Sequence, residues 1–175
     1  MELKLKKISA SGIPEAIRKV ELYRYLNEPE EAESICRDIL AVEPEHQDAL
    51  RLLGLCITDQ FTGELSDRYA EVREIFVKLS GPYERAYYTG LLYERKAKAH
   101  MRKGAPLVSL KVWFEHAMRC FEDAEKILPA ANDDALLRWN RCARLLEELP
   151  PEKEADTVEL DVHDSPPVPT RAASK

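Results

Sequence analysis

The most constraining feature of this chain is a spacing of small, aromatic and proline residues in its C-terminal third. Ala117, Phe121 and Ala124 follow one another at intervals of four and three residues, and Pro129 stands five residues further on. These intervals place the three side chains on one face of an α-helix. Proline then ends the helix, because it has no N–H to donate. The pattern predicts a helix with one face of small and aromatic residues.

A second pattern combines apolar residues with glycine. Gly54 lies between Leu50 and Ile57, and a looser copy surrounds Gly90, 36 positions later. A similar interval of 34 positions separates Ala16 from Leu50. Because glycine has no side chain, a partner helix can approach Gly54 closely. The close packing offsets the loss of about 1 kcal/mol in helix propensity that glycine has relative to alanine. The intervals indicate repeated helical units.

Together these residues resemble the tetratricopeptide repeat, a helix pair that recurs with a period of 34 residues. The resemblance covers residues 13–148; it is strongest in 30–57 and 117–129 and weakest in 62–80, where Arg68 replaces a small alanine. It implies an all-α fold, a right-handed superhelical solenoid of about three helix pairs plus a C-terminal capping helix. It also implies a concave groove, lined by the first helix of each pair, in which such arrays bind other proteins.

Helical spacing, capping residues and prolines give the expected organisation of the chain. We expect an N-terminal extension at 1–12, the repeat domain at 13–148, and an acidic, proline-rich, disordered tail at 149–175. The third helix pair is expected to carry about fifteen extra residues, which lengthen both of its helices. The predicted helices cover 14–26, 29–42, a stretch from 46 to about 58, 66–79, 83–103, 107–128 and 134–148.

Composition excludes several classes of protein. With 175 residues, 45% hydrophobic and 33% charged, the chain is expected to be globular. The longest uncharged apolar stretch, 52–58, is far shorter than the roughly 20 residues that span a bilayer. Three lysines near the N-terminus are not followed by an apolar run, so they do not form a secretory signal. We expect a cytoplasmic protein that does not bind or cross a membrane.

Charge is concentrated in the tail. Residues 148–175 hold seven acidic and three basic side chains, whereas the whole chain has a formal net charge of −6. The remaining body is nearly neutral and mixes arginine with glutamate. It lacks the basic stripe that phosphate backbones require, so nucleic acid is not an expected partner.

Neither metal nor catalytic chemistry has a clear sequence signature. His116 and Cys120 lie one helical turn apart, but no second pair completes a four-ligand zinc site. The cysteines show no C-x-x-C spacing and are expected to pack as small hydrophobic residues. No phosphate-binding glycine loop or G-x-S-x-G nucleophile motif occurs. We therefore expect no metal, no cofactor and no enzymatic activity.

The resemblance assigns five residues to the binding groove. Arg51 would bind a carboxylate or a backbone carbonyl through its planar guanidinium, and Asn140 would add a hydrogen bond. Tyr87 and Leu91, one helical turn apart, would form an apolar floor, and Leu55 is a further groove position. The alternative for each residue is that it turns toward a neighbouring helix or belongs to a solvated face. The lysine and asparagine clamp of some family members is not matched here.

Two other roles remain open. In the first, the long third pair joins two copies into a structural homodimer through Trp113 and Phe114, which either cover a neighbouring surface or form an exposed apolar patch. In the second, the protein acts like bacterial secretion chaperones, which have three such repeats and a similar length and acidity. The tail segment 166–171 also fits a proline-rich docking motif.

Overall fold

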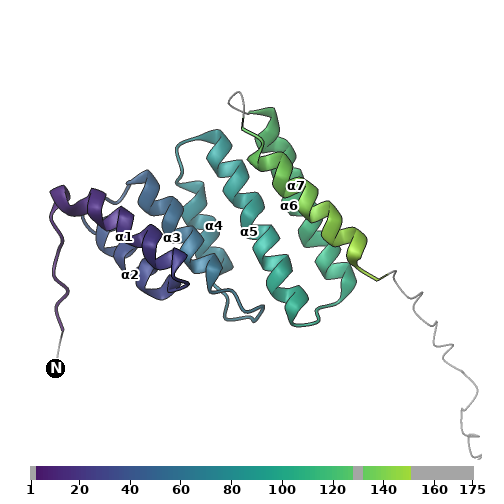
Figure 1. The fold of residues 1–175 in the computed structure, drawn as a ribbon, viewed down its shortest axis with the longest axis horizontal. Helices are drawn as coiled ribbons and strands as arrows, with labels where there is room; N and C mark the ends of the chain where they lie inside the picture. The colour runs from purple at the N-terminus through teal and green to yellow at the C-terminus, as the bar shows by residue number, and fades with distance from the viewer. Residues whose placement is uncertain (1–2, 128–131, 151–175) are drawn as a thin grey trace, which may run out of the picture.

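The computed structural model describes residues 3–127 and 132–150, and within these residues all of the regular secondary structure is helical (Figure 1). The prediction of an all-α fold is confirmed. None of the helices described is long and apolar enough to cross a membrane. The docking motif and, apart from its first two residues, the predicted tail 149–175 lie outside the described part of the chain. The elements are η1 (Ala10–Gly12), α1 (Ile13–Tyr25), α2 (Pro29–Leu40), α3 (Gln47–Asp59), α4 (Tyr69–Val77), α5 (Pro82–Arg102), α6 (Leu107–Lys126) and α7 (Asp134–Glu148).

Prolines set three of the helix starts. Pro14, Pro29 and Pro82 each lie in the first turn of a helix, where the missing N–H would have no intrahelical partner in any case. The fourth helix starts three residues later than predicted. The reason is the side chain of Asp67, which accepts the backbone N–H groups of Thr62 at 3.0 Å and Gly63 at 2.8 Å and so keeps the preceding segment in a compact loop.

The helices pack in chain order and form two layers. Each helix contacts the next one along the chain, and the odd-numbered helices also contact each other, α1 with α3, α3 with α5 and α5 with α7. In the described residues, the backbones of α2, α4 and α6 do not pack against one another, although Arg37 of α2 and Glu71 of α4 form an ion pair at 2.7 Å. Figure 1 shows the resulting row, which runs from α1 to α7. The odd-numbered helices therefore form one continuous layer, and each even-numbered helix covers it without backbone packing against the next even-numbered helix.

Two glycines bring paired helices into direct contact. A Cβ atom on Gly54 of α3 would overlap the ring of Phe76 on α4, and one on Gly90 of α5 would lie 2.7 Å from the ring of Phe121 on α6. Both phenylalanine side chains are fully buried. Each glycine thus leaves room for one aromatic ring of the partner helix, as the sequence pattern predicts.

A buried carboxylate joins α2 to the end of α3 and to the start of α4. Glu33 of α2 accepts hydrogen bonds from Arg68 at 2.6 and 2.7 Å, from Arg37 at 2.6 and 2.9 Å and from Gln60 at 2.7 Å. These bonds, above all those from Arg68, lower the pKa of Glu33 to about 2 although burial opposes the shift. Arg68, which interrupts the repeat pattern in the sequence, therefore anchors the start of α4.

We expect Gly54→Ala to lower the free energy of unfolding by about 1–2 kcal/mol. Overpacking against Phe76 costs about 1–3 kcal/mol, which exceeds the gain of about 1 kcal/mol in helix propensity. Urea denaturation measures the difference, with Ser34→Ala at an exposed position of α2 as the control. A variant more stable than the parent would show that the two helices do not need this close approach.

The Glu33 network makes a second prediction, on pH. Because the pKa of Glu33 is depressed in the folded protein, the stabilisation is complete above the unfolded value of 4.5 and is lost as the pH falls toward about 2. Glu33→Gln should lower the unfolding free energy by about 1–3 kcal/mol at pH 7, and the gap should narrow below pH 4.5. Glu30→Gln, exposed on the same helix, should change the stability little at pH 7. A gap that stayed constant down to pH 2.5 would contradict this account.

Candidate functional site

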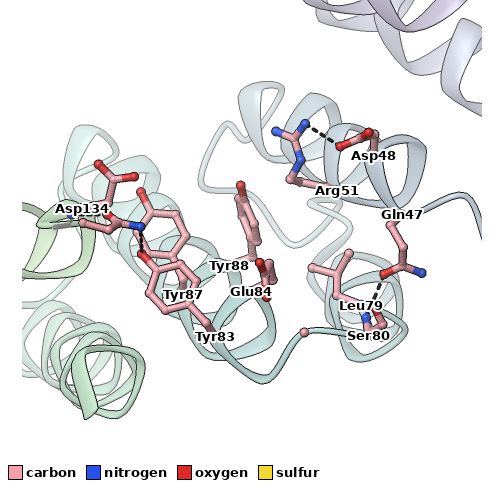
Figure 2. Close-up of a pocket in the computed structure, with 12 residues that line it drawn as sticks. Gln47, Asp48, Arg51, Leu79, Ser80, Tyr83, Glu84, Tyr87, Tyr88 and Asp134 are labelled. Atoms are coloured by element: carbon pink, nitrogen blue, oxygen red, sulfur yellow. Dashed lines mark hydrogen bonds and ion pairs between the residues drawn. The ribbon is translucent and has the colours of Figure 1, made fainter. Parts of the chain in front are cut away.

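A cleft of about 410 Å³ opens between the first turns of α3, α5 and α7. We call it the tyrosine cleft, because three tyrosines of α5 form its centre (Figure 2). Charged and amide side chains surround them. The lining residues are Gln47, Asp48, Arg51, Leu79, Ser80, Gly81, Tyr83, Glu84, Tyr87, Tyr88, Asn132 and Asp134.

The three tyrosine rings hold one another in place. Tyr83 and Tyr87 are stacked with centroids 5.7 Å apart, Tyr88 meets Tyr87 edge-on at 5.1 Å, and Phe121 supports Tyr87 from below at 5.8 Å. Burial raises the pKa of Tyr83 and of Tyr87. Their hydroxyl groups are therefore neutral at physiological pH and can both donate and accept hydrogen bonds.

Polar side chains form the walls of the tyrosine cleft. Arg51 donates to Asp48 at 3.0 Å, and its side chain is 29% exposed. That bond uses one of the five N–H donors of a guanidinium. On the opposite wall, Asn132 donates to the Tyr83 hydroxyl at 3.2 Å. Figure 2 shows Tyr88 between Arg51 on one side and Tyr87 on the other.

The structure brings two of the five predicted groove residues together in this cleft. Arg51 and Tyr87 both line it, whereas Asn140 is half-buried on α7 and outside its lining. Leu55 and Leu91 are instead core residues, with 7% and 3% of their surfaces exposed. The prediction that Leu55 and Leu91 face the groove is wrong, because the odd-numbered helices contact one another directly and cover the middle of α3 and α5. Tyrosines replace the leucines as the apolar surface.

Of the two alternatives for Trp113 and Phe114, the structure favours packing on a neighbouring surface over an exposed apolar patch. Phe114 is completely buried. The ring of Trp113 packs on that of His100, with centroids 4.4 Å apart, and the Lys96 ammonium group lies 4.7 Å above it. Residues of α5 thus cover the ring of Trp113, while Phe114 belongs to the buried core. Val108 and Val112, which precede Trp113 on α6, are exposed large apolar side chains.

A second cleft, of about 230 Å³, lies toward the other end of the odd-numbered helices. We call it the cationic cleft. Sequence reasoning missed it, because the charged residues that line it come from three separate helices, α3, α5 and α7, and form no local pattern. Thr58, Asp59, Arg95, Lys98, Arg102 and Arg138 line it.

Ion pairs tie this cleft to all four odd-numbered helices. Asp59 of α3 accepts from Arg24 of α1 at 2.9 Å and pairs with Arg95 of α5. Arg95 also donates to the carbonyl of Leu55 at 3.1 Å and to the Thr58 hydroxyl at 2.5 Å. These contacts fix Arg95 at the bottom of the cationic cleft.

A buried carboxylate completes the ion pairs on the side of α7. Glu94 has no exposed surface, and its Oε1 pairs with Lys98 and, at 3.4 Å, with Arg138. Its Oε2 is buried without a hydrogen-bond partner in the described part of the chain. The two cations that neutralise Glu94 also line the cationic cleft. They therefore compensate a buried charge and also contribute positive charge to the cleft.

The comparisons with known proteins and the search for metal sites add no assignment. A scan against models of protein families and searches of curated proteins and of solved structures found no match to this chain. Among residues 3–127 and 132–150, no three histidine, cysteine or acidic side chains gather as a metal site would require. The two clefts are therefore interpreted from their own chemistry.

The division between cleft and core makes a testable contrast. Leu91→Ala should lower the free energy of unfolding by about 2–5 kcal/mol, because it leaves a cavity in the core. Arg51→Ala should cost less than about 1 kcal/mol, since its ion pair lies near the surface. Thermal and urea unfolding of the two variants measure both values. If the two substitutions lowered the free energy of unfolding by similar amounts, the assignment of Leu91 to the core and Arg51 to the cleft would be wrong.

Proposed function

We propose that the protein is a non-catalytic, cytoplasmic protein-interaction module of the tetratricopeptide kind, whose tyrosine cleft receives a peptide or helix of another protein. The observation that carries this proposal is the tyrosine cleft itself, a preformed cavity of about 410 Å³ with three supported tyrosines beside Arg51. Rigid aromatic side chains and arginine are the residue types that dominate binding energy at protein interfaces.

The arrangement of the helices also supports the proposal. The consecutive helix pairs, the continuous odd-numbered layer and the two glycine contacts fit a solenoid in which the first helices of the pairs carry the binding surface. The cleft lies on α3, α5 and the start of α7, which are the first helices of the second and third pairs and the capping helix.

The lining indicates which segment the tyrosine cleft would bind. Asp48, Glu84 and Asp134 contribute three carboxylates against the single guanidinium of Arg51. A complementary segment would place an apolar side chain on the tyrosines and a lysine or arginine near the carboxylates. It would offer a backbone carbonyl to Arg51, and the tyrosine hydroxyls would pair with its amide groups.

We expect the substitution Arg51→Glu to abolish most of this binding without unfolding the protein. Partners are captured from the source cytoplasm with the parent and the variant, and the affinity of each purified partner is then measured by calorimetry. The variant should weaken binding by at least about 10-fold, or 1.4 kcal/mol. Arg119→Glu, exposed on α6, should leave it within twofold.

Tyr87→Phe is a second variant that spares the packing on Phe121, whereas Tyr87→Ala would leave a hole beside that ring. Sedimentation of the parent over a range of concentrations tests the homodimer, the alternative role. Partners retained equally by the parent and Arg51→Glu would overturn the proposal. A concentration-dependent dimer with no captured partner would favour the structural role.

A further inference from the structure

The cationic cleft carries a net positive charge in a protein whose formal net charge is −6. Its lining side chains and their ion-pair partners comprise five cations and two carboxylates. Both carboxylates are already shared between two cations each. The groups are Arg24, Arg95, Lys98, Arg102 and Arg138 against Asp59 and Glu94.

The positive charge is incompletely neutralised within the described chain. Arg102 donates to the neutral carbonyl of Phe61, at 3.2 Å, and is exposed. Burial lowers the pKa of Arg95, and repulsion by Arg24 and Arg138 lowers it further. The attraction of Asp59 opposes this shift. An additional anion in the cleft would therefore be attracted by several cations at once.

The direction of α7 brings a strongly acidic part of the chain toward this cleft. Asn132 lies beside Tyr83 and Arg138 beside Glu94, so α7 runs in the same direction as α5 and ends on the side of Arg102 (Figure 1). Beyond the described residues, the sequence continues with one lysine and six acidic residues between 152 and 164. The acidic residues are Glu152, Glu154, Asp156, Glu159, Asp161 and Asp164.

This acidic segment is long enough to reach the cationic cleft. Ten residues of helix separate Arg138 from Glu148, which corresponds to about 15 Å at a rise of 1.5 Å per residue. An extended chain covers about 3.3 Å per residue, so fewer than ten residues span that distance. A short tether also gives the attached segment an effective concentration in the millimolar range, which favours it over free acidic peptides.

We propose that the cationic cleft is a docking surface for acidic peptide, and that its resident occupant is segment 152–164 of the same chain. The carboxylates of this segment would pair with Arg102, Lys98 and Arg138 at the cleft opening. The cleft is separate from the tyrosine cleft, and the proposal does not depend on the partner of the latter. An acidic ligand from another molecule would have to displace the chain's own segment.

Two full-length proteins test this docking. One is the parent, and the other carries the six acidic residues of the segment changed to asparagine or glutamine, with the helical domain untouched. A fluorescent peptide of sequence 152–164 is titrated against each in low salt, and anisotropy reports binding. The neutralised protein should bind the peptide at least about 10-fold more tightly than the parent, because its own segment no longer competes. Binding should weaken as salt is raised.

Variants in the neutralised background locate the binding site. Arg102→Gln should weaken peptide binding at least threefold, whereas Arg119→Gln on α6 and Arg51→Glu in the tyrosine cleft should leave it unchanged. Circular dichroism confirms that each variant is folded. Equal binding by the parent and the neutralised protein, no binding by either, or equal losses in Arg102→Gln and Arg119→Gln would each overturn the proposal. Failure here leaves the tyrosine cleft unaffected, since that site is tested by Arg51→Glu with captured partners.

Discussion

The contact between a glycine and a buried phenylalanine ring is the constraint on which the arrangement depends. Gly54 and Gly90 have no side chain, so Phe76 and Phe121 can lie directly against the backbone of the preceding helix. This approach fixes the distance between the helices of a pair. The odd-numbered helices then meet their own neighbours and cover the middle of α3 and α5. The tyrosine cleft and the cationic cleft lie toward opposite ends of these helices.

Electrostatics divides these openings into two kinds. Carboxylates outnumber cations around the tyrosine cleft, and cations outnumber carboxylates around the cationic cleft. Both lie on α3, α5 and α7, within a few helical turns of each other. The same three helices therefore present opposite charge to two different ligands. A single extended peptide that crossed both clefts would need a basic end and an acidic end, in a fixed order.

Sequence patterns predicted the helices more fully than the site. Glycine, proline and helical spacing are local signals, so the existence of the helices, most of their boundaries and the close approach at Gly54 follow from the sequence, whereas the place of Arg51 and Tyr87 is predicted from the resemblance to the tetratricopeptide repeat. The burial of Leu55, Leu91 and Phe114 does not, because it depends on how far neighbouring helices extend over each face. The cationic cleft has no local signal at all, since ion pairs such as Arg95 with Asp59 join residues far apart in the chain.

The weak lateral packing of α2, α4 and α6 has a mechanical consequence. The layer of odd-numbered helices is continuous, whereas the backbones of the outer helices pack on the helices that precede and follow them in the chain, and α2 and α4 share the ion pair of Arg37 with Glu71. A row of this kind bends about its continuous side, because moving α4 and α6 apart breaks no backbone packing between them, whereas moving α2 from α4 breaks that ion pair. Such bending alters the curvature of the inner layer and so the width of its openings. The ease of bending is therefore set by helices that line neither of the two clefts.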